Sequence, residues 1–284
     1  MLKRISPYNL IMLSFIGLIV VGALLLMMPF AHTPQKDISF LEALFTATSA
    51  VTVTGLSVID IGATFTIYGK LILLVLIQFG GLGVLTISSV LVLLIAKRIG
   101  FYTKKIVAEG LNHNKSYDIY AVAKRVVYIT LLFEATGALC LFISFIQEFP
   151  FGKALFFSVF HSVSAFCNAG VSLFPHSFEG YTYNVFVNII IAFLVIFGGL
   201  GFTTIIQAYE YLRKKRRRLD INSQFSILMT IILLVAGTFL FFILEYKNYH
   251  TLYGKSFFGQ MLISFFHSVS LRTAGFDTIP LEHL

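Results

Sequence analysis

Charged side chains are scarce in this sequence, and tryptophan is absent from it. Only 12% of the 284 residues are charged, against roughly 25% in a typical soluble domain, and 57% are hydrophobic. The mean hydropathy is +0.88. This composition excludes a soluble globular domain and places the chain in a lipid bilayer. Without tryptophan, tyrosine and phenylalanine must supply the aromatic residues at the membrane interfaces.

Cysteine is also rare, and the basic residues have a simple explanation. Cys140 and Cys167 both lie in apolar segments, so we expect no disulfide framework. The formal net charge of +8 comes largely from residues beside apolar runs, such as the basic run 213–218. Such a run is typical of a cytoplasmic loop that contacts anionic lipid headgroups. Without a groove-entering motif or a soluble domain, nucleic acid is not an expected partner.

One kind of stretch occurs three times in the chain. Each copy is a run of small, hydroxylated and apolar residues that follows an apolar segment and contains one glycine near its end. The copies are 45–57, 160–172 and 266–276, with Gly55, Gly170 and Gly275. These glycines are 115 and 105 residues apart. A repeat of this length is too long for a solenoid and suits a helix–loop–helix membrane unit.

Long uncharged or nearly uncharged runs flank the three copies. We expect membrane spans at 9–30, 71–96, 126–147, 181–209 and 221–244. The first run is too long for a signal peptide, and no small-residue cleavage site follows it. The sequence therefore predicts an all-α polytopic membrane protein of repeated span–loop–span units. Residues 1–112 and 113–220 form two complete units, and 221–284 form a third with only its first span and loop.

The positions of lysine and arginine indicate how the repeated stretches lie in the membrane. If each stretch dips in and returns, 15 of the 21 basic residues fall on the side of the amino terminus. If the first stretch crossed, the pairs at 97–98 and 104–105 would be translocated instead. Since cytoplasmic loops are enriched in basic residues, we expect re-entrant loops and a cytoplasmic amino terminus.

A repeated re-entrant loop predicts a pathway for cations. Irregular backbone inside a membrane is tolerated only where protein buries it or where it lines a water-filled cavity. Short helices expected at 39–50, 152–166 and 256–270 would direct their partially negative ends to the centre. Rings of backbone carbonyls can replace the hydration shell of a cation, and glycine permits the close approach. An intramembrane serine protease is a remote alternative, because no Gly-x-Ser-x-Gly motif occurs.

These residues resemble a known family. Val-Thr-Val-Thr-Gly-Leu-Ser at 51–57, His-Ser-Val-Ser-Ala-Phe-Cys-Asn-Ala-Gly at 161–170 and His-Ser-Val-Ser-Leu-Arg-Thr-Ala-Gly-Phe at 267–276 resemble pore loops one to three of the Trk/Ktr/HKT superfamily of potassium transporters. The resemblance is strongest to the membrane subunits of bacterial Ktr systems. Gln-Phe-Gly-Gly-Leu-Gly at 78–83 and Ile-Phe-Gly-Gly-Leu-Gly-Phe at 196–202 fit the second helices of the same family.

The resemblance implies a potassium filter with one glycine from each of four units. The backbone positions that it implies as ion ligands are Val53, Thr54, Gly55, Asn168, Ala169, Gly170, Thr273, Ala274 and Gly275. Glycine in the first loop implies a preference for K⁺ over Na⁺. Because only three loops occur in the 284 residues, we expect a truncated or partial transporter, and a non-conducting fragment is the alternative.

The resemblance also implies how such a protein works and with what it assembles. It implies Na⁺ as a stimulating ion, and we expect no cofactor in this chain. The energy that a cation gains from an inside-negative membrane potential predicts uptake driven by that potential. The resemblance implies a homodimer in the bacterial cytoplasmic membrane. It further implies a cytosolic nucleotide-binding regulatory subunit that forms a ring, of the RCK type.

Charged and ionisable residues near the loops have two interpretations each. Glu134 lies within a span and either faces the pore entrance or pairs with Arg272, which precedes Gly275. We expect Arg272 to turn into the protein and support the filter, because an inward-pointing arginine would repel K⁺. His161 and His267 occupy matching positions, and we expect them to cap or pack the short helices rather than bind a metal.

Two acidic residues and two glycine-rich motifs each have two interpretations. Asp60 and Asp277 follow their glycines and either draw cations to the outer mouth or are ordinary solvated residues. The two Gly-Gly-Leu-Gly motifs indicate either close helix packing or a bend in the second helix of each unit.

Overall fold

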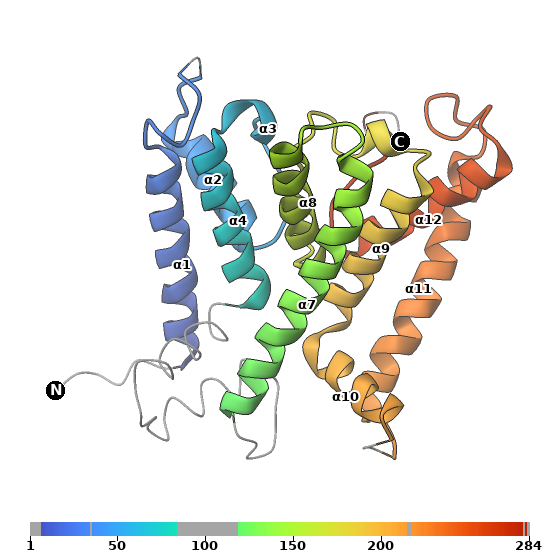
Figure 1. Ribbon diagram of the computed structural model, residues 1–284. Coiled ribbons are helices and arrows are strands. Elements are labelled where there is room, and N and C mark those ends of the chain that lie inside the picture. Colours follow the sequence, from blue (N-terminus) through green and yellow to red (C-terminus); the bar gives the residue numbers. More distant parts are fainter. Residues whose placement is uncertain (1–6, 35, 84–118, 215–216, 281, 283–284) are drawn as a thin grey trace.

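The computed structural model describes residues 7–34, 36–83, 119–214, 217–280 and 282, and within them it is helical (Figure 1). The sole β-type pairing in this described part is an isolated bridge between His32 and Phe65. The expected all-α fold is confirmed. The elements are α1 (Pro7–Leu26), α2 (Phe40–Val51), α3 (Ile61–Thr64), α4 (Ile67–Leu82), α7 (Ile119–Phe145), α8 (Phe151–Phe166), η1 (Glu179–Tyr181), α9 (Val185–Leu200), α10 (Phe202–Leu212), α11 (Ile221–Glu245) and α12 (Phe257–Thr273).

The longest helices match two of the expected spans and correct a third. Residues Lys124–Phe145 of α7 and all of α11 are long and apolar enough to cross a membrane. The expected span 181–209 is wrong in its outline, because α9 begins only at Val185 and the chain bends by 99° between α9 and α10. Gly201, with φ of +82°, occupies the break, where a left-handed conformation favours glycine. The second half of the expected span 71–96, from residue 84 onward, lies outside the described residues.

The three short helices α2, α8 and α12 lie close to the ranges expected from the sequence. Ser39 caps α2 and forms a reciprocal capping box with Glu42. Ser256 caps α12 by accepting a hydrogen bond from the amide of Gly259. α8 follows Pro150, which cannot supply a side-chain cap. The expected short helices at 39–50, 152–166 and 256–270 are therefore confirmed to within one to three residues at each end.

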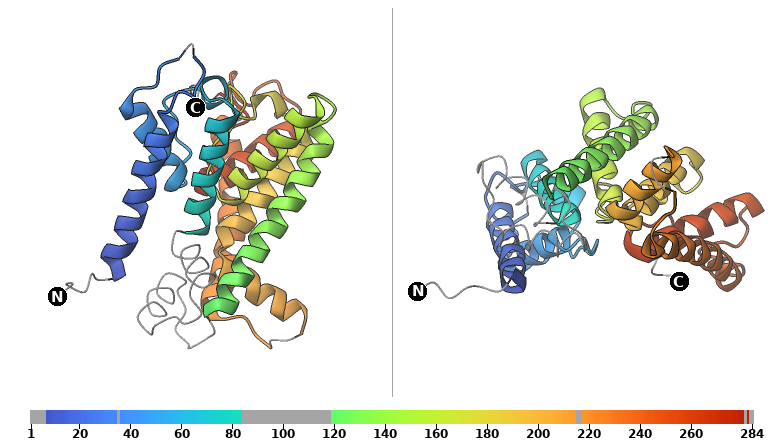
Figure 2. Two further views of the ribbon diagram at one scale, coloured as in Figure 1. Left: turned by 60° about the vertical axis from the view of Figure 1, so that its left-hand side comes forward. Right: turned by 90° about the horizontal axis from the view of Figure 1, so that it is seen from below.

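The three short helices begin on one face of the molecule, which we call the loop face (Figure 1). Each packs against a longer helix that precedes it: α2 against α1, α8 against α7, and α12 against α11. α4 and α9 then pack beside α2 and α8, and α9 also contacts α12. Seen from below, the groups follow one another around an arc (Figure 2).

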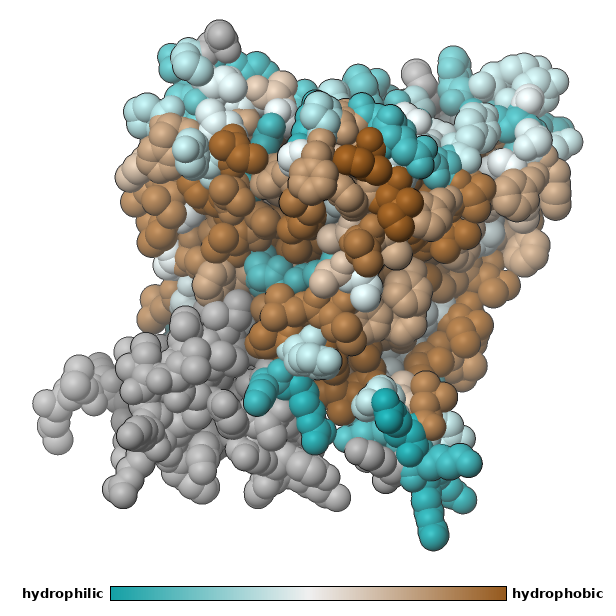
Figure 3. Space-filling view, viewed as in Figure 1, coloured by the Kyte–Doolittle hydropathy of each residue, from teal (hydrophilic) through white to brown (hydrophobic). Residues whose placement is uncertain are grey.

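A dense aromatic core holds the middle of the arc together. Phe145, Phe160, Phe178 and Phe266 are almost fully buried. By contrast, α11 exposes much of its apolar surface, with Leu228, Ile231 and Phe239 more than half exposed. Figure 3 shows a broad hydrophobic band below a hydrophilic loop face. A soluble protein rarely exposes so large an apolar surface, so the band fits contact with lipid in a multi-pass membrane protein.

Candidate functional site

The three glycines predicted to mark the loops meet at one place. A Cβ atom built on Gly55 would lie 2.8 Å from the carbonyl oxygen of Ala169 and 3.2 Å from that of Ala274. One built on Gly275 would lie 3.8 Å from the carbonyl oxygen of Thr54. All three glycines have positive φ, between +64° and +82°. The carbonyl groups that precede the glycines are therefore gathered around a common centre.

Gly170 is the most tightly enclosed of the three. A Cβ atom there would collide with the carbonyl of Ala274 and would lie 3.1 Å from the Cα atom of Gly275. Since this obstacle is backbone rather than a flexible side chain, no small adjustment would remove the clash. Only glycine fits this position without moving the third loop.

The first two loops leave their helices in the same way. The amide of Thr54 donates to the carbonyl of Ser49 at 2.9 Å, and the amide of Ala169 donates to that of Ser164 at 2.7 Å. Each bond spans five residues and closes a Schellman motif. The residues in the left-handed position are Val53, with φ of +56°, and Asn168, with φ of +60°. For Val53, which is β-branched, this conformation is strained.

The third loop leaves its helix differently. α12 continues to Thr273, and Ala274 keeps a right-handed helical conformation with φ of −95°. Only Gly275 then turns left-handed. The reason lies in the sequence, because four residues separate Ser270 from Gly275, whereas five separate Ser164 from Gly170. This difference in spacing is the sequence signal for the different backbone of the third loop.

Buried histidines hold the chain that leaves the second and third loops. The ring of His161 bonds through Nδ1 to the carbonyl of Phe157 at 2.8 Å, and its Nε2 accepts from the amide of Leu173 at 3.1 Å. His267 contacts both the amide and the hydroxyl of Thr278 through Nε2, at 3.4 and 3.3 Å. The expectation that both histidines pack the short helices is confirmed. Sequence reasoning missed that they also brace the outgoing chain.

Among the described residues, no group of three or more His, Cys, Asp or Glu side chains is placed to hold a metal ion. Serine hydroxyls add a second brace. Ser164 donates to the carbonyl of Val171 at 2.8 Å, and Ser270 donates to that of Phe276. Each bond ties the end of a short helix to the residue that follows its loop glycine.

The side chain of Asn168 links two loops and the bent helix. With its amide oriented so that oxygen and nitrogen are both satisfied, the nitrogen donates to the Thr273 hydroxyl at 3.0 Å and to the Val195 carbonyl at 3.1 Å. Its oxygen accepts from the amide of Gly199 at 3.0 Å. Val195 and Gly199 are spaced as hydrogen-bond partners within α9. Asn168 therefore binds the carbonyl of Val195 and the amide of Gly199, which belong to the last turn of α9 before the break at Gly201.

Glu134 and Arg272 do not contact each other. The Cys167 thiol lies 3.8 Å from Glu134 Oε1, within hydrogen-bond range for sulfur, and only 6% of Glu134 is exposed. Arg272 donates to the hydroxyl of Thr230 on α11 at 3.2 Å. Among the described residues the ion pair is that of Arg125 and Glu210, so the pairing of Glu134 with Arg272 is not observed. Arg272 turns toward α11, as expected of a side chain directed into the protein.

The two acids beside the loops have structural partners on the loop face. Asp60 caps α3 by accepting from the amide of Ala63 at 2.9 Å. Asp277 lies next to Ser177, whose hydroxyl accepts from the Asp277 amide at 3.2 Å. Burial raises the pKa of the Asp277 carboxyl above its usual value, and a hydrogen bond from Ser177 partly offsets this. Asp60 is therefore a helix cap, and Asp277 is part of a packed loop.

Both Gly-Gly-Leu-Gly motifs serve close helix packing, and the second also marks a bend. Side chains at Gly80 and Gly198 would collide with the carbonyls of Val51 and Phe166, so these glycines let α4 and α9 pack on the ends of the short helices. The last glycine of each motif, Gly83 or Gly201, has positive φ and ends its helix. The second motif thus combines close packing with the 99° bend at Gly201, and the first combines close packing with the end of α4 at Gly83.

Comparison with known sequences gives a consistent set of relatives. Residues 5–284 match the family described as "TrkH: Cation transport protein". The "Ktr system potassium uptake protein B" of Vibrio alginolyticus is 38% identical over 96% of this chain and 60% of its own length, and that of Bacillus subtilis is 35% identical over 97% and 61%. The "Potassium/sodium uptake protein NtpJ" of Enterococcus hirae is 35% identical over 99% and 62%. The chain thus spans about three fifths of the length of these relatives.

A solved structure shares the fold. The potassium transporter TrkH from Vibrio parahaemolyticus superposes with a TM-score of 0.70 over 98% of this chain and 53% of its own, at 22% sequence identity. These relatives carry the names of transport proteins, none of an enzyme. The family match over nearly the whole chain decides the assignment. The chain belongs to the TrkH family of cation transport proteins.

Proposed function

We propose that these residues form three sides of a cation pathway and that the protein containing them takes up potassium across a membrane. The observation that carries the proposal is the meeting of three loops, in which the carbonyls of Thr54, Ala169 and Ala274 lie beside glycines of neighbouring loops. The names of the relatives from Vibrio alginolyticus and Bacillus subtilis support potassium as the ion, and that from Enterococcus hirae adds sodium.

Elementary electrostatics supports a cation rather than an anion at this centre. Carbonyl oxygens carry partial negative charge and can replace the waters that a cation sheds. The carboxyl ends of α2, α8 and α12 reach the same place, and helix dipoles make these ends partially negative. Arg272, the nearest basic side chain in sequence, is bonded to Thr230 on α11.

The proposed ion ligands are backbone atoms of three residues in each loop. They are Val53, Thr54 and Gly55 in the first, Asn168, Ala169 and Gly170 in the second, and Thr273, Ala274 and Gly275 in the third. We propose Arg272 and Glu134 as support for the loops, through their separate contacts with Thr230 and Cys167.

The division into repeated units accounts for the arc of helices. We propose units at 1–112, 113–220 and 221–284, each contributing one loop. Because the relatives extend well beyond the matched region, we propose that a fourth side of the pathway comes from sequence outside these 284 residues.

Energy for uptake can come from the membrane potential alone. An inside-negative potential contributes roughly 2.3 kcal/mol per 100 mV for each monovalent cation. We propose potential-driven uptake with sodium stimulation, in a bacterial cytoplasmic membrane with the amino terminus inside. The phrase "Ktr system" in the names of two relatives supports assembly with a second component, which we propose is a cytosolic nucleotide-binding ring of the RCK type beneath a homodimer.

The test is growth of a potassium-uptake-deficient bacterium at low K⁺. We expect the intact protein to restore growth and the isolated 284-residue chain to fail. Gly55→Ser should weaken discrimination against Na⁺, because its Cβ would lie only 2.8 Å from the Ala169 carbonyl and displace an ion ligand. Unchanged uptake ratios of K⁺ to Na⁺ in Gly55→Ser would contradict the assignment of the filter.

A second candidate is a non-conducting fragment that only associates with other membrane subunits. The observation in its favour is that the chain provides three loops and spans about three fifths of its relatives. Restoration of growth by the 284 residues alone would exclude it. Such a result would instead indicate that oligomerisation completes the pathway.

A further inference from the structure

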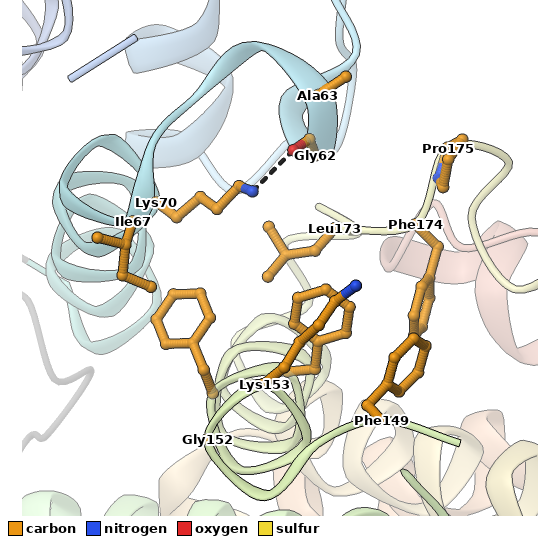
Figure 4. Close-up of a pocket in the computed structure, with 12 residues that line it drawn as sticks. Gly62, Ala63, Ile67, Lys70, Phe149, Gly152, Lys153, Leu173, Phe174 and Pro175 are labelled. Carbon is orange, nitrogen blue, oxygen red and sulfur yellow. Dashed lines mark hydrogen bonds between the residues drawn. The ribbon is translucent and has the colours of Figure 1, made fainter. Parts of the chain in front are cut away.

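A cavity of about 670 Å³ lies on the loop face, and none of the three converging glycines lines it (Figure 4). Its walls come from α3, the first turn of α4, the first turns of α8 and the chain that follows Gly170. Lys70 and Lys153 line it together with a set of apolar side chains. The cavity therefore combines two positive charges with a hydrophobic wall.

The two lysines leave their positive charges largely uncompensated. Lys70 Nζ donates to the carbonyl of Gly62 at 2.7 Å, and Lys153 Nζ lies over the rings of Phe149 and Phe157 at 4.8 and 5.2 Å. Neither forms an ion pair within the described part of the chain. Figure 4 shows Leu173 between the two lysine side chains.

The surroundings add one acidic charge and one partial positive charge. Asp60 is the acid whose charge acts on Lys70, but its carboxylate caps α3 through the Ala63 amide. α8 begins without a side-chain cap, and Lys153 and Gly152 of its first turn line the cavity. The amino end of this 16-residue helix contributes a further partial positive charge. Two lysines and a helix amino end outweigh the single acid, so the cavity favours an anion over a cation.

The apolar wall continues onto the membrane-facing surface. Ile67, Phe156 and Phe149 line the cavity, and Phe151 and Leu155 beside it on α8 are 66% and 46% exposed. A small inorganic anion would leave this surface unused. A molecule with one negatively charged group and an apolar chain would satisfy both parts of the site.

We propose that this cavity binds the phosphate group of an anionic phospholipid, with the phosphate near Lys70 and Lys153 and an acyl chain along the exposed face of α8. The site is separate from the proposed ion pathway and does not depend on it. Free phosphate shares the charged chemistry, so the experiment must separate the two sources. Basic residues near a membrane surface each contribute about fivefold to binding of anionic lipid.

The absence of tryptophan from the 284 residues provides a reporter. The substitution Phe156→Trp in the intact protein places an indole in the cavity wall. Its fluorescence is obtained by subtracting the fluorescence of the same protein without the substitution. Brominated phosphatidylglycerol and brominated phosphatidylcholine are then compared as quenchers. Lys70→Gln and Lys153→Gln remove the charges, and Lys70→Arg with Lys153→Arg keeps them. Lys255→Gln is the matched control, because Lys255 also lies over an aromatic ring on the loop face, that of Tyr183.

We expect phosphatidylglycerol to quench at lower concentration than phosphatidylcholine, with the preference falling about fivefold in each glutamine variant and about 25-fold in the pair. The arginine pair and Lys255→Gln should keep the preference. Equal quenching by both lipids in every variant would overturn the proposal and leave only unselective lipid contact. Displacement of phosphatidylglycerol by glycerol 3-phosphate or inorganic phosphate at similar concentration would also overturn it, in favour of a site for soluble phosphate.

Discussion

The second and third loops are braced from behind by a histidine, whereas the first loop has a threonine at the same place in its helix. His161 and His267 bond to Leu173 and Thr278, in the chain that leaves their loops. The hydroxyl of Thr46 instead donates to the carbonyl of Glu42 in its own helix. Three copies of one stretch therefore meet at a common centre but are supported in two different ways.

Burial of the outgoing chain follows the same division. After Gly170, Val171 and Leu173 are 5% and 3% exposed, whereas Leu56 and Val58, at the matching positions after Gly55, are 61% and 57% exposed. The third loop resembles the second, with its outgoing chain nearly fully buried. Loops two and three are thus part of the core of the described molecule. Within the described residues the first loop is held mainly by its own turn, and substitutions should separate the two classes.

The largest effect is expected from Gly170→Ala, in the most enclosed loop. The added Cβ would meet the backbone carbonyl of Ala274, so either the second or the third loop must move. We expect loss of K⁺ uptake into vesicles reconstituted with the intact protein. Gly275→Ala should keep part of the activity, because the nearest atom would lie at 3.8 Å from the added Cβ. The loss that remains should come mainly from the strain of placing alanine at a positive φ. Gly180→Ala, with open space around it, is the control and should be unaffected.

His161→Ala should be the most destabilising side-chain substitution of a brace. It removes a fully buried ring that stacks on Phe174 at 4.6 Å and leaves the amide of Leu173 without its acceptor. A cavity and an unpaired buried amide together cost about 3 kcal/mol. The free energy of unfolding in mixed detergent micelles measures the loss. A destabilisation no greater than that of Thr46→Ala would show that the histidine brace does not distinguish these loops.

The sequence predicted the parts that local signals determine. The short helices were expected to begin at Ser39 and Ser256, which the structure shows to be their caps, and the recurring glycines indicated which loops should share a centre. It did not predict the bonds of His161 or Asn168, because their partners are chosen by packing and not by spacing. The predicted span 181–209 is too long because the apolar run continues through Gly201. Hydropathy does not reveal that Gly201 adopts a left-handed conformation, with φ of +82°, and ends the helix.

Asn168→Ala should have an intermediate effect. The amide of Asn168 joins loop two to Thr273 in loop three and to the turn of α9 between Val195 and Gly199. Its removal leaves several polar groups to find new partners, at a cost of about 1–3 kcal/mol. The unfolding free energy should fall by this amount, and K⁺ uptake should fall with it because two loops lose their connection. Full uptake together with unchanged stability would mean that the link is incidental.

The smallest effects on stability are expected from Ser49 and Ser164, which occupy matching positions in the first and second short helices. They also give the clearest contrast between the first and second loops. Ser164 donates to the carbonyl of Val171, so Ser164→Ala should cost about 1 kcal/mol of unfolding free energy. The buried hydroxyl of Ser49 has no hydrogen-bond partner among the described residues, so Ser49→Ala should be neutral or slightly stabilising. Unfolding of both variants in the same micelles gives the comparison. An equal loss at both positions would indicate that the Ser49 hydroxyl has a partner in the intact protein, and that the first loop is braced as firmly as the second.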